Sequence, residues 1–232
     1  MLEIRRGADR GRADHGWLKS FHTFSFADYY DPEWMGYGPL RVINDDRVAA
    51  GEGFGKHGHR DMEILTYLLA GALEHRDSMG NGSVIRPGDL QGMSAGTGVT
   101  HSEFNPSATE EVHFLQIWLL PEALRLKPGY EQKHFTAADK RGRLRLIAAP
   151  DAGDGALLIH QQARVYAGLL DGAERTEFSV AEGRRAWLQM ARGTLSVDEL
   201  RLSAGDGART TGPAQLTLHG GAAAEVLAFD LP

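Results

Sequence analysis

Residues 51–63 read Gly-Glu-Gly-Phe-Gly-Lys-His-Gly-His-Arg-Asp-Met-Glu, and a second polar motif, His101-Ser102-Glu103, follows one long hairpin later. On a β-strand, residues i and i+2 face the same side and lie roughly 6–7 Å apart. His57 and His59 therefore share one face, as do His101 and Glu103. Three imidazoles and a carboxylate suit a borderline divalent metal. The two motifs predict a metal site built on β-strands.

The spacing of these motifs is weak evidence without its context. The chain has ten histidines, so chance alone supplies on the order of one His-x-His or His-x-Glu triplet. The first motif lies among three glycines and precedes an apolar run at 64–69; the second follows a turn at 87–89 and closes with Asn105-Pro106. Turn signals, short β-rich runs and paired ligands together predict a β-barrel with a metal at its mouth.

Composition excludes several classes of protein. The chain has 232 residues, of which 42% are hydrophobic and 24% charged, with a formal net charge of −6 and no cysteine. No cluster of Lys and Arg offers a surface for nucleic acid or anionic lipid. A disulfide framework is impossible, and neither a secretory pattern nor an apolar run of membrane-spanning length is present. We expect a cytoplasmic protein that contacts neither nucleic acid nor membrane, while a protein partner stays open.

The strand pattern repeats along the chain. Apolar runs bounded by turn residues recur throughout, and helix-length amphipathic segments are scarce. Residues 67–95 resemble 187–208, and 114–121 resemble 226–232, which is the trace that a duplicated barrel leaves. The linker is expected near 121–142. The second copy has neither His-x-His nor His-x-Glu, so only the N-terminal half is expected to hold the metal.

Further motifs surround the two histidine motifs. The first cupin motif is met by Gly51, His57, His59 and Glu63, with its closing glycine one place late at Gly71; the second is met by Gly98, His101 and Asn105, with Gly96 where cupins usually carry proline. More specific signals are Gly16-Trp17-Leu18, His22-Thr23-Phe24-Ser25-Phe26, Tyr30-Asp31-Pro32, residues 41–46 and residues 93–98. Together these motifs resemble the pirin family of bicupins, densely in the first half of the chain and only in general pattern in the second. The resemblance is closest to bacterial pirin-like quercetin 2,3-dioxygenases.

This resemblance implies an all-β fold of two stacked cupin (jelly-roll) barrels. Residues 1–130 would form the metal-binding domain, and 131–232 a degenerate cupin domain without the metal motif. The resemblance also implies one divalent transition metal per chain, with iron preferred and copper, nickel, manganese, cobalt or zinc as alternatives. His57, His59, His101 and Glu103 would hold it.

The choice of carboxylate has a competitor. Glu63 has the strand parity of His57 and His59 and occupies the position of the usual cupin carboxylate. The family resemblance favours Glu103 as the ligand, and we expect Glu63 to orient a ligand imidazole from behind.

The activity implied by the resemblance is opening of the central ring of quercetin or a related flavonol by dioxygen, with release of carbon monoxide. Glu103 would act as the catalytic base that takes the 3-hydroxyl proton. Phe24, Phe26, Phe54 and Met93 are candidates for an apolar pocket wall and Gln116 for a polar contact, although packing in the core is the commoner role for such residues. Two alternatives remain: an iron-binding regulatory protein that acts through protein partners, and a cupin enzyme for another small molecule.

Overall fold

The computed structural model describes residues 2–232. Strands make up 58% of the chain and helices 4%, so the prediction of an all-β protein is confirmed. Two compact units are present: an N-terminal unit of residues 11–134 and 157–161, and a C-terminal unit of residues 135–156 and 162–232 together with the start of the chain through Arg10. The sequence placed one boundary between 130 and 131, whereas these units interleave along the chain.

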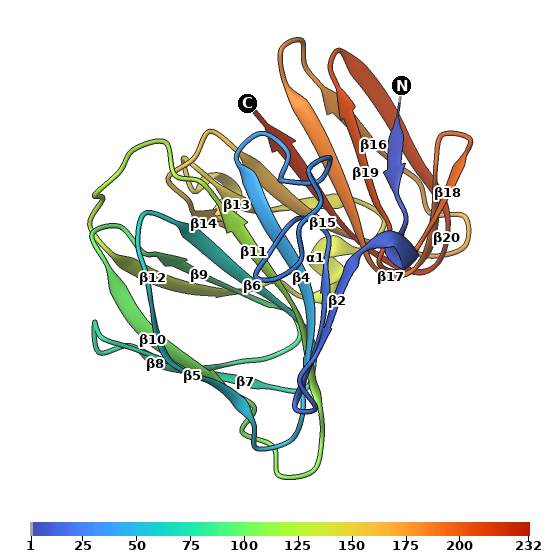
Figure 1. Ribbon diagram of the computed structural model, residues 1–232. Helices are drawn as coiled ribbons and strands as arrows, with labels where there is room; N and C mark the ends of the chain where they lie inside the picture. Colours follow the sequence, from blue (N-terminus) through green and yellow to red (C-terminus); the bar gives the residue numbers. More distant parts are fainter. Residues whose placement is uncertain (1) are drawn as a thin grey trace. The chain divides into compact units, whose positions relative to one another are not determined.

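The N-terminal unit consists of two antiparallel sheets that form opposite layers (Figure 1). The larger sheet has seven strands, in the order β12 (Gly129–His134), β9 (Asp89–Ser94), β6 (Glu63–Ala70), β11 (Val112–Leu119), β4 (Leu40–Val48), β3 (Leu18–His22) and β2 (Gly11–Asp14). The smaller sheet has the order β5 (Gly53–His59), β10 (Val99–Phe104), β7 (Leu73–Asp77) and β8 (Gly82–Ile85). The short strand β14 (Leu157–Leu158) also belongs to this unit.

The chain changes sheets immediately after the first histidine motif. β5 ends at His59, and β6 begins at Glu63 in the other sheet. Between them Asp61 adopts a left-handed conformation with φ 49°, and its N–H donates to the Gly96 carbonyl. A left-handed residue interrupts the two-residue alternation of a strand. The parity argument that placed Glu63 on the face of His57 and His59 therefore does not extend across residues 60–62.

Gly96 explains why this chain lacks the proline that cupins usually carry there. Its φ is +46°, and a Cβ built on it would lie 2.1 Å from the Leu126 carbonyl oxygen. Proline is held near φ −65°, so it cannot adopt this conformation. The same backbone holds the segment around Leu126, because Thr97 N–H donates to the Leu126 carbonyl at 2.9 Å.

Most strands of the C-terminal unit lie in one antiparallel array. Its order is β1 (Glu3–Arg5), β19 (Gly207–Thr211), β17 (Arg185–Val197), β20 (Ala214–Leu231), β15 (Arg164–Leu170) and β13 (Leu144–Ala149); β16 (Thr176–Val180) pairs with β20, and β18 (Leu200–Ser203) pairs with β17. The helical segments are α1 (Ala137–Lys140) and two short 3₁₀ turns, η1 (Gly7–Asp9) and η2 (Gly153–Gly155). None of the helices described within residues 2–232 has the length and apolarity required to cross a membrane.

Aliphatic side chains fill the core of the C-terminal unit. Leu188, Met190, Leu195, Val226 and their neighbours form one continuous buried cluster. Among the described residues, the groups of side chains close enough to share a metal ion all lie in the N-terminal unit. The C-terminal unit therefore has an apolar core, whereas the potential metal ligands lie in the N-terminal unit.

The expected linker contains regular structure. β12 falls within residues 121–142 and pairs with β9 from Gly129↔Ser94 to His134↔Asp89. α1 follows it, and Thr136 caps this helix through a reciprocal bond with Asp139. The strand has the polar sequence Gly-Tyr-Glu-Gln-Lys-His and is half-buried, as expected of an edge strand.

Candidate metal centre and its cavity

Three histidines converge from two neighbouring strands of the smaller sheet. His101 on β10 lies directly opposite His57 on β5, and His59 is two residues further along β5. Their ring centroids lie 4.4–4.9 Å apart, and His57 Nε2 is 3.0 Å from His101 Nε2. The three residues offer ligand atoms within 4.8 Å of one another. The sequence motifs are thus brought together as the strand periodicity predicts.

Burial keeps His59 and His101 neutral, and a backbone carbonyl orients the His57 ring. Burial, followed by the nearby His57, lowers the pKa of His59 to about 4, and burial lowers the pKa of His101 to about 3 with further contributions from His57, His59 and His75. His57 Nδ1 lies 2.8 Å from the Gly55 carbonyl oxygen. Because a carbonyl only accepts, Nδ1 carries the proton, and the Nε2 lone pair faces His101. Neutral imidazole is the form that binds metals.

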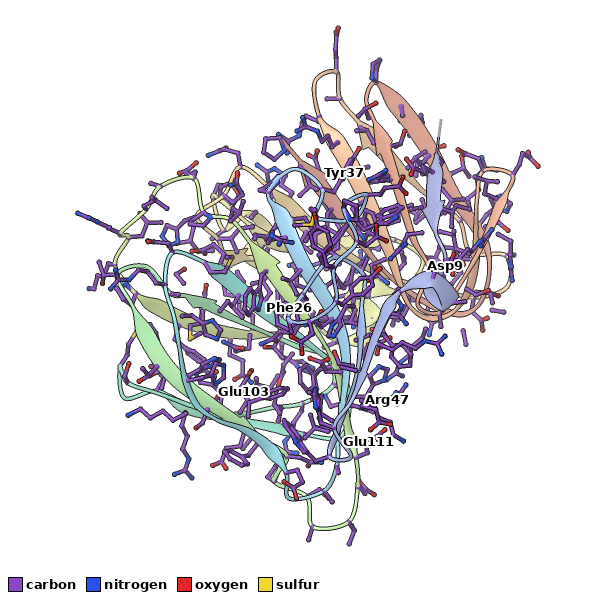
Figure 2. The ribbon with its side chains drawn as sticks, viewed as in Figure 1. Asp9, Phe26, Tyr37, Arg47, Glu103 and Glu111 are labelled. Carbon is purple, nitrogen blue, oxygen red and sulfur yellow. The ribbon has the colours of Figure 1, made fainter. Side chains whose placement is uncertain are left out.

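Glu103 is buried next to this group. Its Oε2 accepts a hydrogen bond from Gln116 Nε2 at 3.3 Å, and Gln116 in turn accepts one from Thr66. Its Oε1 is buried without a hydrogen-bond partner among the described residues. Burial, together with the charge of Asp46, raises the pKa of Glu103 to about 7. Figure 2 shows Glu103 between the two sheets of the N-terminal unit.

The sequence did not single out His75, yet the structure places it against His101. It is fully buried, and its Nδ1 lies 3.4 Å from His101 Nδ1. Its Nε2 lies 3.4 Å from Asp77 Oδ2, and its ring stacks on Tyr130. His75, His101 and Glu103 form a second group of three potential ligands, which shares His101 with the first. The sequence signal that could have found His75 is its spacing of two residues from Asp77, which places both side chains on one face of β7.

Glu63 lies apart from the histidines. Its Oε2 accepts hydrogen bonds from Ser94 Oγ at 2.8 Å and from the His160 N–H at 3.1 Å. Neither group of potential metal ligands includes it. Thus Glu63 fixes the 157–161 segment within the N-terminal unit, and its expected contact with a ligand imidazole is absent from the described hydrogen bonds.

A cavity of about 590 Å³ opens beside the histidines, a size typical of small-molecule sites. His57, His59 and Glu103 line one part of it. Of the predicted pocket residues, Phe26, Phe54 and Gln116 line the cavity, whereas Phe24 and Met93 are buried and absent from its lining. Trp118 adds a further aromatic wall and packs edge-on against His59.

Polar residues line another wall of the cavity. They are Ser20 and His22 on β3 and Asn44 and Asp46 on β4. Residues 41–46 served in the sequence only as a family signal, so Asp46 was missed as a cavity residue, although strand alternation places it on the face opposite Asp45. Asp45 instead contacts His113, with 2.7 Å between its Oδ1 and His113 Nε2.

Comparison with known proteins identifies the family. The family model for pirin matches residues 4–119, and that for the quercetinase C-terminal cupin domain matches residues 146–231. Quercetin 2,3-dioxygenase of Escherichia coli K12 is 47% identical over 232 residues, covering 100% of this chain and 99% of that protein. The chain belongs to the pirin family. Its two halves are therefore two cupin domains, as the resemblance implied.

One solved structure of the family contains a bound metal. The structure of the bacterial pirin YhhW from E. coli in complex with nickel(II) is 46% identical, covers 100% of this chain and 99% of its own, and superposes with a TM-score of 0.95. A pirin-like protein of Caulobacter vibrioides is 41% identical over 231 residues. A family member thus binds a metal, and the side chains described above provide a His/Glu group for a single ion in this chain.

Proposed function

We propose that this protein is a metal-dependent dioxygenase that opens the central ring of quercetin or a related flavonol and releases carbon monoxide. The observation that carries the proposal is the three-histidine group, of which His57 and His59 line an aromatic-walled cavity of about 590 Å³. The name of the E. coli relative supports the choice of substrate. One dioxygen is consumed, both of its oxygen atoms enter the ring-opened product, and one ring carbon leaves as carbon monoxide.

The residues present fit a divalent ion. Two nitrogens that are each about 2.1 Å from a metal, at right angles to one another, are about 3.0 Å apart, and His57 Nε2 and His101 Nε2 are 3.0 Å apart. The buried Oε1 of Glu103 has no hydrogen-bond partner among the described residues, and a cation would satisfy it. We assign His57, His59, His101 and Glu103 as the ligands, with iron the first candidate and nickel, copper, manganese, cobalt or zinc as alternatives.

His75 and Asp77 orient the site from behind. With His75 neutral, its Nε2–H donates to Asp77, and its Nδ1 accepts from the Nδ1–H of His101. Burial lowers the pKa of His75, which favours this neutral form. The arrangement leaves the His101 Nε2 lone pair free for a metal, as partners of metal-binding histidines commonly do.

Each part of the cavity has a role in the proposed reaction. A bound metal, held by His57, His59, His101 and Glu103, would supply Lewis-acid polarisation of the 3-hydroxy-4-oxo edge of the flavonol. Glu103 accepts the 3-hydroxyl proton, and Gln116 holds the Glu103 carboxylate during that transfer. Phe26, Phe54 and Trp118 enclose the flat rings and exclude water.

The activity is tested with metal-reconstituted protein. Separate samples loaded with iron, copper, nickel, manganese or cobalt receive quercetin and dioxygen, while flavonol absorbance and carbon monoxide are followed. We expect loss of quercetin with matching carbon monoxide in at least one metal form, and none with metal-free protein. Background turnover in every metal form would exclude the flavonol activity and favour a regulatory role through a protein partner or chemistry on another small molecule.

The assignment of the carboxylate predicts unequal effects of two matched substitutions. Glu103→Gln replaces the carboxylate beside His101. Glu63→Gln replaces a different carboxylate, which contacts Ser94 and His160. We expect the first to weaken metal binding at least about tenfold more than the second. Isothermal titration with nickel(II) measures both affinities, and thermal melting of the metal-free proteins shows whether either change acts through stability. A larger loss in Glu63→Gln would reverse the assignment.

A further inference from the structure

Four buried polar side chains form a continuous patch on the cavity wall. Ser20 on β3 lies directly opposite Asp46 on β4, and His22 lies opposite Asn44. All four are at least nine-tenths buried and line the cavity. Because residues i and i+2 of a strand share a face, both pairs present their side chains to the same space as Glu103.

The hydrogen bonds within this patch leave two groups available. Ser20 Oγ donates to Asp46 Oδ1, and His22 Nδ1 lies 2.8 Å from Asn44 Oδ1. His22 Nδ1 donates there, because an amide oxygen only accepts. Among the described residues, none donates to Asp46 Oδ2, and none accepts from the Asn44 amide nitrogen. The wall therefore offers an acceptor and a donor on adjacent positions of one strand face.

Burial of the Asp46 carboxylate carries a desolvation penalty. A buried carboxylate is normally paired with a cation or with several donors, yet no ion pair to Asp46 occurs among the residues that the structure describes. Burial raises its pKa to about 7 against the lowering contribution of Ser20. An apolar residue would pack here without that penalty. A ligand group that supplies the missing hydrogen bond accounts for the carboxylate.

We propose that Asp46 and Asn44 form a hydroxyl-binding subsite of the cavity, which selects aromatic ligands that carry a phenolic hydroxyl in addition to the group held at the metal. A hydroxyl both donates and accepts, so it can donate to Asp46 Oδ2 and accept from the Asn44 amide. The aromatic walls at Phe26, Tyr29 and Phe114 fit the ring that bears it. The subsite rests on the proposed function only in taking a flavonol as the ligand.

Binding of two flavonols tests the subsite without turnover. Quercetin and 3-hydroxyflavone share the 3-hydroxy-4-oxo edge, but only quercetin carries further hydroxyl groups. Their dissociation constants are measured with nickel-loaded protein under nitrogen, by quenching of tryptophan fluorescence. We expect the parent protein to prefer quercetin by about tenfold or more, the gain from one hydrogen bond to a charged group.

Substitutions on β4 separate the subsite from general effects. We expect Asp46→Leu to abolish the preference for quercetin and Asp46→Asn to reduce it at least about threefold, with the affinity for 3-hydroxyflavone little changed. Asp45→Asn is the matched control, because Asp45 is the next residue on the same strand and contacts His113 instead; it should retain the preference. An unchanged preference in Asp46→Asn, or an equal loss in Asp45→Asn, would overturn the proposal.

A third variant guards against a folding defect in the others. Ser20→Ala removes the internal donor to Asp46 Oδ1 and leaves the carboxylate in place, so it should retain or increase the preference. A fall to the value for Asp46→Leu would contradict the subsite. Failure of the two proposals is distinguishable: absence of carbon monoxide in every metal form rejects the dioxygenase, while a preference that survives in Asp46→Leu rejects only the subsite.

Discussion

Replacing His101 by alanine is expected to weaken metal binding by at least about a hundredfold and to reduce flavonol turnover to the metal-free background. His101 belongs to both groups of potential ligands, and it links the β5 histidines to Glu103 and His75. Of the residues in these two groups, His101 is the only one that both share. Titration with nickel(II) and the carbon monoxide assay measure the two effects.

The control for this substitution is another buried histidine. His113 on β11 contacts Asp45 and does not line the cavity, so His113→Ala removes a buried imidazole of the same size away from the site. We expect His113→Ala to bind the metal with the parent affinity, even if it is less stable. Equal metal loss in both variants would show that unfolding, rather than a missing ligand, explains the effect of His101→Ala.

The substitution Gly96→Ala is expected to lower the free energy of unfolding by about 2–4 kcal/mol. An alanine at φ +46° is strained, and its Cβ would lie 2.1 Å from the Leu126 carbonyl oxygen, so the backbone must move. Gly129→Ala is the control, because a Cβ there meets no atom within 4 Å; we expect a change within about 1 kcal/mol. Urea denaturation of metal-free protein measures both, and equal effects would contradict the steric explanation.

Strand periodicity predicted which side chains of the candidate metal centre share a strand face, because that signal is local. His57 and His59 share a face of β5, and His101 and Glu103 share a face of β10, so two spacings of two residues carry the arrangement. Which strands pair is not contained in those spacings. The family resemblance supplied that information, whereas the all-β character was already indicated by the apolar runs between turn residues.

The remaining features depend on interactions that the motif spacings do not contain. The position of Glu63 depends on the left-handed conformation of Asp61, which ended the strand parity used to place it. The subsite at Asp46 depends on pairing between β3 and β4, and His75 on pairing between β7 and β10. β12 was missed because an edge strand tolerates a polar sequence. Phe24 and Met93 were candidates for the pocket wall but lie in the core, where large apolar side chains are more often found.

The hydrogen bonds from Ser94 and His160 to Glu63 have a consequence for dissecting the chain. A fragment that ends at residue 130 would lose most of β12 and the whole 157–161 segment, which belongs to the N-terminal unit. Glu63 would then lose the hydrogen bond from the His160 backbone N–H. The unit that carries the potential metal ligands thus includes a segment from beyond residue 130, and a fragment cut there is expected to lack part of its fold.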